Sequence, residues 1–395
     1  MKILFVDTTI HEDLIGGGHL YLPGLMKGLV QKGHNVQLVV SGVPNIRVRP
    51  QIIDSGAVVV SSPWGAASVI EDKAPAFAAW VNDLNPDVYV ISASYDVGWV
   101  VLPLLNLSIP TLAIAHSNAE GFYMPVRHYK DFLTTAIGVS HEICNQYNQS
   151  CGVSQEQIKW IPYGIQAVLE FPSRPEAQPL SIIFAGRVEE ADKRISDVVK
   201  VLHALDAAAA PFLFNLVGDG SRSEWVKQEL QPLISKGIVR ISGWMSGPDV
   251  LQEMQRSDIF ILTSSSEGFS ISLTESMANG CCPVVTDIPS GSIQLIRDNE
   301  NGFLLPVGDV NGFVQKLEQL SSDRILLEKM RRAAWETGKD FSVDRMVEAY
   351  AQTFMAAAIF AREHRRKDDK NFPLMSTCRS RLPAWIRRIR SKLKN

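Results

Sequence analysis

The sequence predicts an α/β protein with two consecutive doubly wound domains, each built around a parallel β-sheet. A length of 395 residues exceeds what one typical core accommodates and suits two domains. Short, continuously apolar runs alternate with helix-length amphipathic segments along the chain, which is typical of parallel strands buried on both faces. The alternation pauses at the proline-rich stretch 164–180 and then restarts, so we expect a linker there.

In the first half, short apolar runs predict the strands, and Tyr21–Lys32 and Val69–Leu84 are helical segments between some of them. The strand runs are "KILFV" (2–6), "NVQLVVS" (35–41), "AVVVSS" (57–62), "DVYVISAS" (87–94), "TLAIAHS" (111–117) and "AIGVS" (136–140). Each strand of such a domain presents the loop at its carboxyl end to a common edge of the sheet.

The second half repeats this pattern, with helical segments such as Ser223–Lys236 and Pro248–Gln255. Its strand runs are "SIIFAGR" (181–187), "FLFNLVGDG" (212–220), "IVRISGW" (238–244), "DIFILTSSS" (258–266) and "CPVVTD" (282–287). We therefore expect an N-terminal domain at 1–168, a C-terminal domain at 180–342, a last helix at about 343–361 that crosses back to the first domain, and a basic extension at 362–395.

Charge is unevenly distributed along the chain. Residues 362–395 carry twelve Lys/Arg and three Asp/Glu, a net +9, so the total of −3 leaves −12 on the first 361 residues. An acidic body argues against nucleic acid as a partner. The tail has two interpretations, a solvated C-terminus or a stretch, Leu382–Asn395, that docks on anionic lipid.

The five cysteines include no CxxC pair, and the histidines do not cluster. This pattern suggests neither a disulfide framework nor a metal site, and a reducing cytosol fits it best. Because no apolar run approaches the roughly 18 residues of a membrane span, we expect a cytoplasmic protein, with peripheral contact at the inner face of the membrane only through the tail.

Glycines follow the first strand as Gly16, Gly17 and Gly18. Glycines before a helix let backbone N–H groups approach an anion, although a flexible turn explains them equally well. The spacing matches neither a dinucleotide fingerprint nor a Walker loop.

Two cations, Arg187 and Lys193, follow the first strand of the second half in "AGRVEEADKR". An Arg fork and a Lys point charge at a strand end can neutralise a diphosphate. A solvated charged loop is the alternative interpretation.

Two further turns of the second half expose backbone at strand ends. Gly218–Asp219–Gly220 follows one strand, and Trp244 and Met245 follow the next, where an aromatic beside exposed backbone could hold a nucleobase. The alternative for Trp244 is a place in an interdomain core.

The segment "SSSEGFSISLTESMANG" (264–280) combines hydroxyls, the two carboxylates Glu267 and Glu275, and the start of a helix. Free N–H groups at Ser270 to Thr274 would point at a phosphate. Ser272 with Glu275 also fits the S-x-x-E capping box, so a helix cap competes with a binding role for Glu275.

His116 stands at the carboxyl end of a strand of the first half, where a ligand cleft is expected. A lone histidine there is more often a structural hydrogen-bonding residue.

In this order the motifs resemble a retaining glycosyltransferase of family 4, over about residues 1–360. The most specific part is 181–309, with the seven-residue gap between Glu267 and Glu275. The resemblance implies the GT-B fold, in which two Rossmann-like doubly wound parallel-sheet domains face each other across a cleft. It also implies metal-independent transfer, without a cofactor, of a sugar from a nucleotide diphosphate sugar (UDP or GDP) to a glycan or lipid-linked acceptor, in cell-envelope or exopolysaccharide biosynthesis.

The resemblance also implies roles for individual residues. His116, Glu267, Arg187 and Lys193 would be the catalytic set, with the two cations on the diphosphate, Glu267 on the transferred sugar and His116 near its reacting end. Glu275 would hydrogen-bond the donor ribose. The remaining donor-binding positions would be Gly16, Gly17, Gly18, Gly218, Asp219, Trp244, Met245, Phe269, Ser270, Ile271, Ser272, Leu273 and Thr274.

The chain departs from the family pattern at four positions. Ser270 and Ser272 stand where Gly and Pro are common, Arg194 where Gly is common, and Tyr163 where Asn is usual. Two other functions stay open: a GT-B nucleotide-sugar epimerase, and a non-catalytic sugar-nucleotide-binding subunit.

Overall fold

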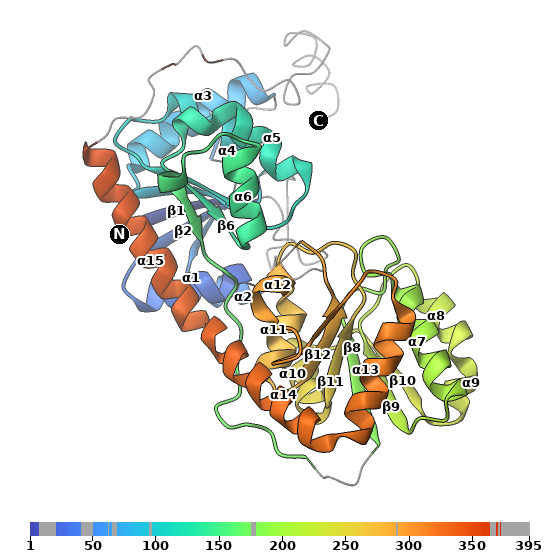
Figure 1. Cartoon of the computed structure of the whole chain (residues 1–395). Helices are drawn as coiled ribbons and strands as arrows, with labels where there is room; N and C mark the ends of the chain where they lie inside the picture. The colour runs from blue at the N-terminus through green and yellow to red at the C-terminus, as the bar shows by residue number, and fades with distance from the viewer. Residues whose placement is uncertain are drawn as a thin grey trace. The chain divides into compact units, whose positions relative to one another are not determined.

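The computed structural model describes residues 1–7, 21–40, 50–61, 63–64, 69–94, 97–174, 179–289, 291–363, 369 and 372. The chain divides into two compact units, 1–162 with 346–395, and 163–345. Both are parallel sheets covered by helices (Figure 1), as the apolar runs predict. In the described part of the chain, none of the helices combines the length and apolar character that a membrane span needs.

The first unit contains a parallel sheet with strand order β3-β2-β1-β4-β5-β6-β7. Its strands are β1 (Lys2–Asp7), β2 (Asn35–Val40), β3 (Val58–Ser61), β4 (Val88–Ile91), β5 (Thr111–Ala115), β6 (Thr135–Gly138) and β7 (Ile158–Trp160). Its helices are α1 (Tyr21–Gln31), α2 (Pro50–Ile53), α3 (Ile70–Leu84), α4 (Val97–Val100), η2 (Leu102–Leu104), α5 (Glu120–Tyr129), η3 (Lys130–Phe132), α6 (His141–Gln149) and η4 (Gln155–Gln157).

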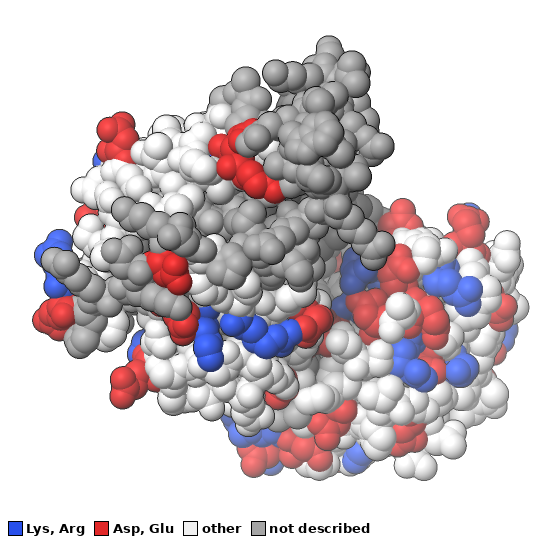
Figure 2. Space-filling model, turned by 90° about the horizontal axis from the view of Figure 1, so that it is seen from above, with Lys and Arg blue, Asp and Glu red and all other residues white. Residues whose placement is uncertain are grey.

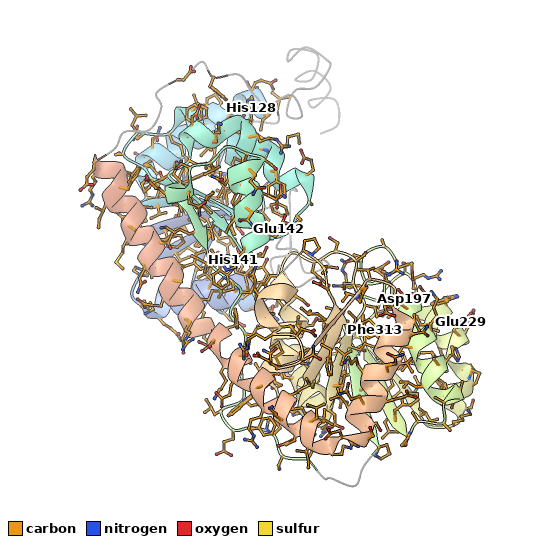
Figure 3. The ribbon with its side chains drawn as sticks, in the orientation of Figure 1. His128, His141, Glu142, Asp197, Glu229 and Phe313 are labelled. Atoms are coloured by element: carbon orange, nitrogen blue, oxygen red, sulfur yellow. The ribbon has the colours of Figure 1, made fainter. Side chains whose placement is uncertain are left out.

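The last helix, α15 (Val343–Glu363), packs on this first unit from Met346 onward. The ring of Phe354 lies 6.0 Å from that of Phe5 in β1, and Glu348 pairs with Lys32 at 2.6 Å. Most of the basic extension lies outside the described residues. Its Phe372 is described, and its ring lies 5.0 Å from that of His128 on α5 (Figure 3).

The second unit has strand order β10-β9-β8-β11-β12-β13, again all parallel. Its strands are β8 (Leu180–Ala185), β9 (Phe212–Val217), β10 (Val239–Gly243), β11 (Ile259–Leu262), β12 (Cys282–Thr286) and β13 (Phe303–Leu305). Its helices are α7 (Ile195–Ala207), α8 (Ser223–Glu229), α9 (Gln231–Ser235), α10 (Gly247–Arg256), α11 (Ile271–Ala278), α12 (Gly291–Leu295), α13 (Val310–Ser322), α14 (Arg324–Gly338) and η5 (Lys339–Phe341).

The strand order of the second unit fixes where a ligand is expected. The chain moves outward from β8 to β10 and then returns to pair β11 with the other side of β8. This reversal lies between β8 and β11, and open α/β sheets bind ligands at the carboxyl ends of the strands beside such a reversal. The register of the strands also brings two of these loops together. Ala185, at the end of β8, pairs with Val217, at the end of β9, so the turns after these strands leave the sheet side by side.

The stretch 164–180, expected as a linker, falls within the second unit, and the segment 163–174 is docked on that unit. Trp335 donates its indole N–H to the Val168 carbonyl at 3.1 Å, and Arg331 donates to the Pro172 carbonyl at 3.0 Å. Arg174 bonds to Asp258 at 3.3 Å and to the carbonyls of Met254 and Gln255. The chain passes from the first unit to the second between 162 and 163, so 164–174 does not form the predicted linker between them. Prolines restrict a chain without preventing it from packing.

We expect Arg174→Ala to lower the unfolding free energy of the second unit by about 3 kcal/mol, because it leaves Asp258 buried without its closest cation. Urea unfolding measures the effect. The matched control is Arg256→Ala, since the Arg256 side chain is 71% exposed in its ion pair with Glu253, and its loss should cost less than about 1 kcal/mol. Equal losses in the two variants would show that the buried arginine does not fix the 163–174 segment.

Candidate functional site

The candidate site lies at the carboxyl edge of the second unit's sheet, where the loops after β8 to β11 emerge. The structure brings Arg187, Lys193, the 264–275 segment, the Gly218 turn and Trp244 to this one edge, because all their strands run parallel. Acidic and basic side chains are interspersed over the face of the molecule seen in Figure 2.

An ion pair between Lys193 and Glu267 joins the loops after β8 and β11. Each side chain is only 11% exposed, so the two charges attract each other in a medium of low dielectric. The Ser264 hydroxyl also donates to the same carboxylate oxygen, Oε1, at 2.7 Å. The two residues are 74 positions apart, so their spacing in the sequence does not reveal that they form a pair.

Arg187 has a different environment. Its guanidinium pairs with Asp192 within the same loop, and the two side chains are 48% and 28% exposed. An exposed pair of this kind contributes little to stability, so the guanidinium can exchange Asp192 for another anion at small cost. Asp192 was not among the predicted site residues.

Arg194, which follows Lys193, has φ +49°, in the left-handed region that favours glycine. This explains structurally why the related motif commonly has Gly there. Here the Arg194 guanidinium bonds to Asp197 in the first turn of α7 (labelled in Figure 3), with Nε 2.7 Å from Oδ2. The side chain is therefore held at the start of α7.

The start of α11 differs from the sequence prediction. The N-cap is Ser270, whose hydroxyl accepts from the Leu273 N–H at 3.3 Å, and the Ser270 carbonyl accepts from Thr274 at 3.1 Å. The capping box of Ser272 with Glu275 is therefore wrong, because the helix begins at Ile271 and Glu275 lies two positions beyond N3. Two of the five amides expected to be free, those of Leu273 and Thr274, are also engaged.

Glu275 lies in a partly buried position on α11, and burial raises the pKa of its carboxyl to about 7. A group with this pKa exists in both protonation states near neutral pH. It can therefore both donate to and accept from a ligand hydroxyl.

The loop that carries Phe269 is packed from three sides. Its ring lies 5.7 Å from that of Tyr163 and 6.0 Å from that of Phe341. A Cβ on Gly291 would come within 2.8 Å of the same ring, so this glycine permits the close approach of α12. Tyr163, where asparagine is usual, therefore supports the loop of Glu267.

The Gly218 turn is shaped by contact with the loop after β8. Gly218 has φ +132°, and a Cβ there would lie 1.9 Å from the Gly186 carbonyl oxygen. Asp219 accepts from the Gly220 N–H at 2.7 Å and from the Ser223 hydroxyl at 2.5 Å, and these hydrogen bonds lower its pKa. The glycines thus have a packing reason, and their contact with a base stays a prediction.

Trp244 is 65% exposed and follows Gly243, which has φ +67°. Met245 is half-buried beside it. An exposed indole at this edge is available for contact with a ligand.

In the first unit, His116 contacts two hydroxyls that the sequence analysis missed. Tyr21 Oη and Ser92 Oγ each lie 3.3 Å from His116 Nε2 and 2.8 Å from each other. Ser92 follows β4 just as His116 follows β5, and this shared position after a strand was the available signal. Gly16, Gly17 and Gly18 lie outside the described residues.

Ser140, the last residue of "GVS", caps α6 by accepting from the Ile143 N–H at 3.3 Å. His141 and Glu142 follow it in the first turn of α6 (Figure 3). The His141 ring packs 4.1 Å from that of Trp160 at the end of β7, and burial lowers its pKa. This motif therefore has a helix-capping role. Within the described ranges, no group of three or more His, Cys, Asp or Glu side chains could hold a metal ion.

Comparison with known proteins gives two adjacent family matches. The model described as "Glycosyltransferase Family 4" matches residues 15–167, and "Glycosyl transferases group 1" matches residues 168–337. A lipopolysaccharide 1,6-galactosyltransferase of Escherichia coli K12 is 26% identical over 64% of this chain and 70% of that protein.

Two further similarities differ in coverage. The GtfA subunit of a UDP-N-acetylglucosamine–peptide N-acetylglucosaminyltransferase from Streptococcus gordonii is 25% identical over 56% of this chain, and the match spans only 44% of that protein. A structure of Anabaena HepE in complex with UDP has a TM-score of 0.71 at 17% identity, covering 90% of this chain and 100% of that one. The predicted GT-B fold is therefore confirmed.

The raised pKa of Glu275 makes stability depend on pH. The folded protein keeps the proton up to about pH 7, whereas the unfolded chain loses it near 4.5, so unfolding free energy falls as pH rises between these values. We expect Glu275→Gln to remove this fall, of up to about 3 kcal/mol, in urea unfolding at pH 4.5 and 8. The exposed Glu300→Gln should leave it intact. Equal pH dependence in wild type and Glu275→Gln would contradict the assignment.

Proposed function

Because glycosyltransferase family models match both halves of a chain with the GT-B fold, we propose that this protein is a glycosyltransferase of cell-envelope or exopolysaccharide biosynthesis. Its donor would be a nucleotide diphosphate sugar and its acceptor a glycan or lipid-linked glycan. The observation that carries the proposal is the pairing of Lys193 with Glu267 at the strand-order reversal, beside Arg187 and the start of α11.

Each end of a nucleotide sugar has a matching group at this edge. Arg187 and Lys193 supply two positive charges for the diphosphate, one as a fork and one as a point charge. Glu275 offers a carboxyl of raised pKa to ribose hydroxyls, and Glu267 with the 269–271 backbone would hold the transferred sugar. Trp244 and the Gly218 turn are proposed for the base. The roles of Gly16–Gly18 and His116 rest on the family resemblance.

Uridine diphosphate is the nucleotide we propose. HepE has the same fold and was solved with UDP, and the S. gordonii relative is described as using UDP-N-acetylglucosamine. Guanosine and adenosine diphosphates are the alternatives that a binding panel would identify.

We propose a metal-independent transfer that retains the configuration at the anomeric carbon. The bond from this carbon to the diphosphate oxygen breaks, and the acceptor oxygen bonds to the same face. The acceptor proton goes to the leaving phosphate. Arg187 and Lys193 would stabilise the negative charge that develops on the diphosphate, which is the largest contribution expected for such a step.

UDP binding tests the donor site directly. We expect Arg187→Ala and Lys193→Ala each to weaken UDP binding about tenfold in calorimetry, because each removes a charge-assisted hydrogen bond. Lys200→Ala is the matched control, since this lysine is 60% exposed on α7 and pairs with Asp197. Unchanged affinity in both site variants, with wild type binding UDP, would place the nucleotide elsewhere.

Product stereochemistry tests the reaction class. With a UDP-sugar and its acceptor in EDTA, proton NMR of the new linkage should show the anomeric configuration of the donor. An inverted product would exclude the retaining mechanism, and loss of activity in EDTA that added magnesium restores would exclude metal independence.

A further inference from the structure

Three consecutive hydroxyl residues, Thr263, Ser264 and Ser265, follow β11, and we call them the hydroxyl clamp. Four consecutive carbonyls of the loop after β8 accept hydrogen bonds from its two outer members. Thr263 Oγ1 donates to the carbonyls of Lys193 (2.9 Å) and Arg194 (3.2 Å). The Ser265 amide donates to Asp192 (2.9 Å) and its hydroxyl to Ala191 (3.3 Å).

Ser264, the middle residue of the clamp, contacts Glu267, the negative partner of the Lys193–Glu267 ion pair. Its hydroxyl donates to Glu267 Oε1 at 2.7 Å, the oxygen that Lys193 also contacts. Its own carbonyl accepts from the Thr286 hydroxyl at 2.5 Å, which ties the clamp to the end of β12. The clamp therefore holds the Lys193 backbone through one residue and the Glu267 side chain through the next.

Burial makes these bonds matter. Thr263 is 1% exposed and Ser264 is fully buried. A buried hydroxyl costs free energy unless it is hydrogen-bonded, and Val and Ala would fill similar space without that requirement. The hydroxyls are thus explained by the groups they hold.

The bonds to Glu267 also leave one of its oxygens for a ligand. Ser264 and Lys193 both contact Oε1, and no other side chain in the described part of the chain donates to Oε2. A carboxylate oxygen oriented in this way can accept from a sugar hydroxyl without breaking the ion pair.

We propose that Thr263 and Ser264 are positioning residues with separate tasks. Thr263 sets where Lys193 meets the diphosphate, and Ser264 orients Glu267 toward the sugar. The inference rests on the proposed function. It predicts that loss of the Thr263 hydroxyl weakens binding of both UDP and a UDP-sugar, whereas loss of the Ser264 hydroxyl weakens binding of the UDP-sugar alone, a separation that a general loss of stability would not produce.

Calorimetry first measures wild-type binding of UDP-glucose, UDP-galactose and UDP-N-acetylglucosamine, and the most tightly bound of these is chosen. The binding of UDP and of this chosen UDP-sugar is then measured for each variant. We expect Thr263→Val to bind both UDP and the chosen UDP-sugar about tenfold more weakly than wild type does. Thr263→Ser keeps the hydroxyl group, so its affinities for both ligands should lie within about twofold of those of wild type.

We expect Ser264→Ala to keep UDP affinity within about twofold of wild type, yet to bind the UDP-sugar about tenfold more weakly and to hydrolyse it more slowly. The matched control is Ser276→Ala, because Ser276 is fully buried on α11 and donates to the Leu273 carbonyl at 2.8 Å. It should preserve both affinities.

Each outcome decides between the two proposals. If wild type binds UDP and a UDP-sugar but Thr263→Val and Ser264→Ala behave like Ser276→Ala, the positioning roles are overturned and the proposed function stands. If Ser264→Ala lowers the affinity for UDP and for the UDP-sugar equally, the role of Ser264 is structural and the inference also fails. If wild type binds none of these ligands, both proposals fall.

Discussion

Two nearly buried opposite charges, Lys193 and Glu267, determine how the carboxyl edge of the second unit is built. Each side chain is 11% exposed, and either charge alone would be costly at that depth. The loops after β8 and β11 must therefore meet, and the hydrogen bonds of Thr263, Ser264 and Ser265 bring them together. Arg187, on the same loop but 48% exposed, remains the more accessible cation.

The architecture followed from the sequence, since parallel strands buried on both faces need continuous apolar runs. Every run interpreted as a strand is confirmed, and the reversal between β8 and β11 follows the order such domains adopt. The strands β7 and β13 were missed because each has three residues, too few to show a period. The docking of 163–174 was missed because its partners, Arg331 and Trp335, come far later in the chain.

The site was predictable to the level of which loops carry it. The sequence pattern identified Arg187, Lys193, Glu267 and Glu275, but the hydrogen bonds that hold Lys193 join it to Thr263 and Glu267, about 70 positions away, which no local pattern reveals. The S-x-x-E pattern also misplaced the N-cap of α11, because the pattern alone does not identify which serine precedes the helix. The N-cap is Ser270. The resemblance to family 4 supplied roles that spacing alone left open.

A crystal structure of the protein with UDP would show directly whether the loop after β8 binds the diphosphate. We expect diphosphate oxygens within hydrogen-bond distance of Arg187 and Lys193, with Arg187 released from Asp192 and Glu267 still held by Ser264. UDP bound away from this edge, with the Arg187–Asp192 pair intact, would show that these two cations do not form the donor site.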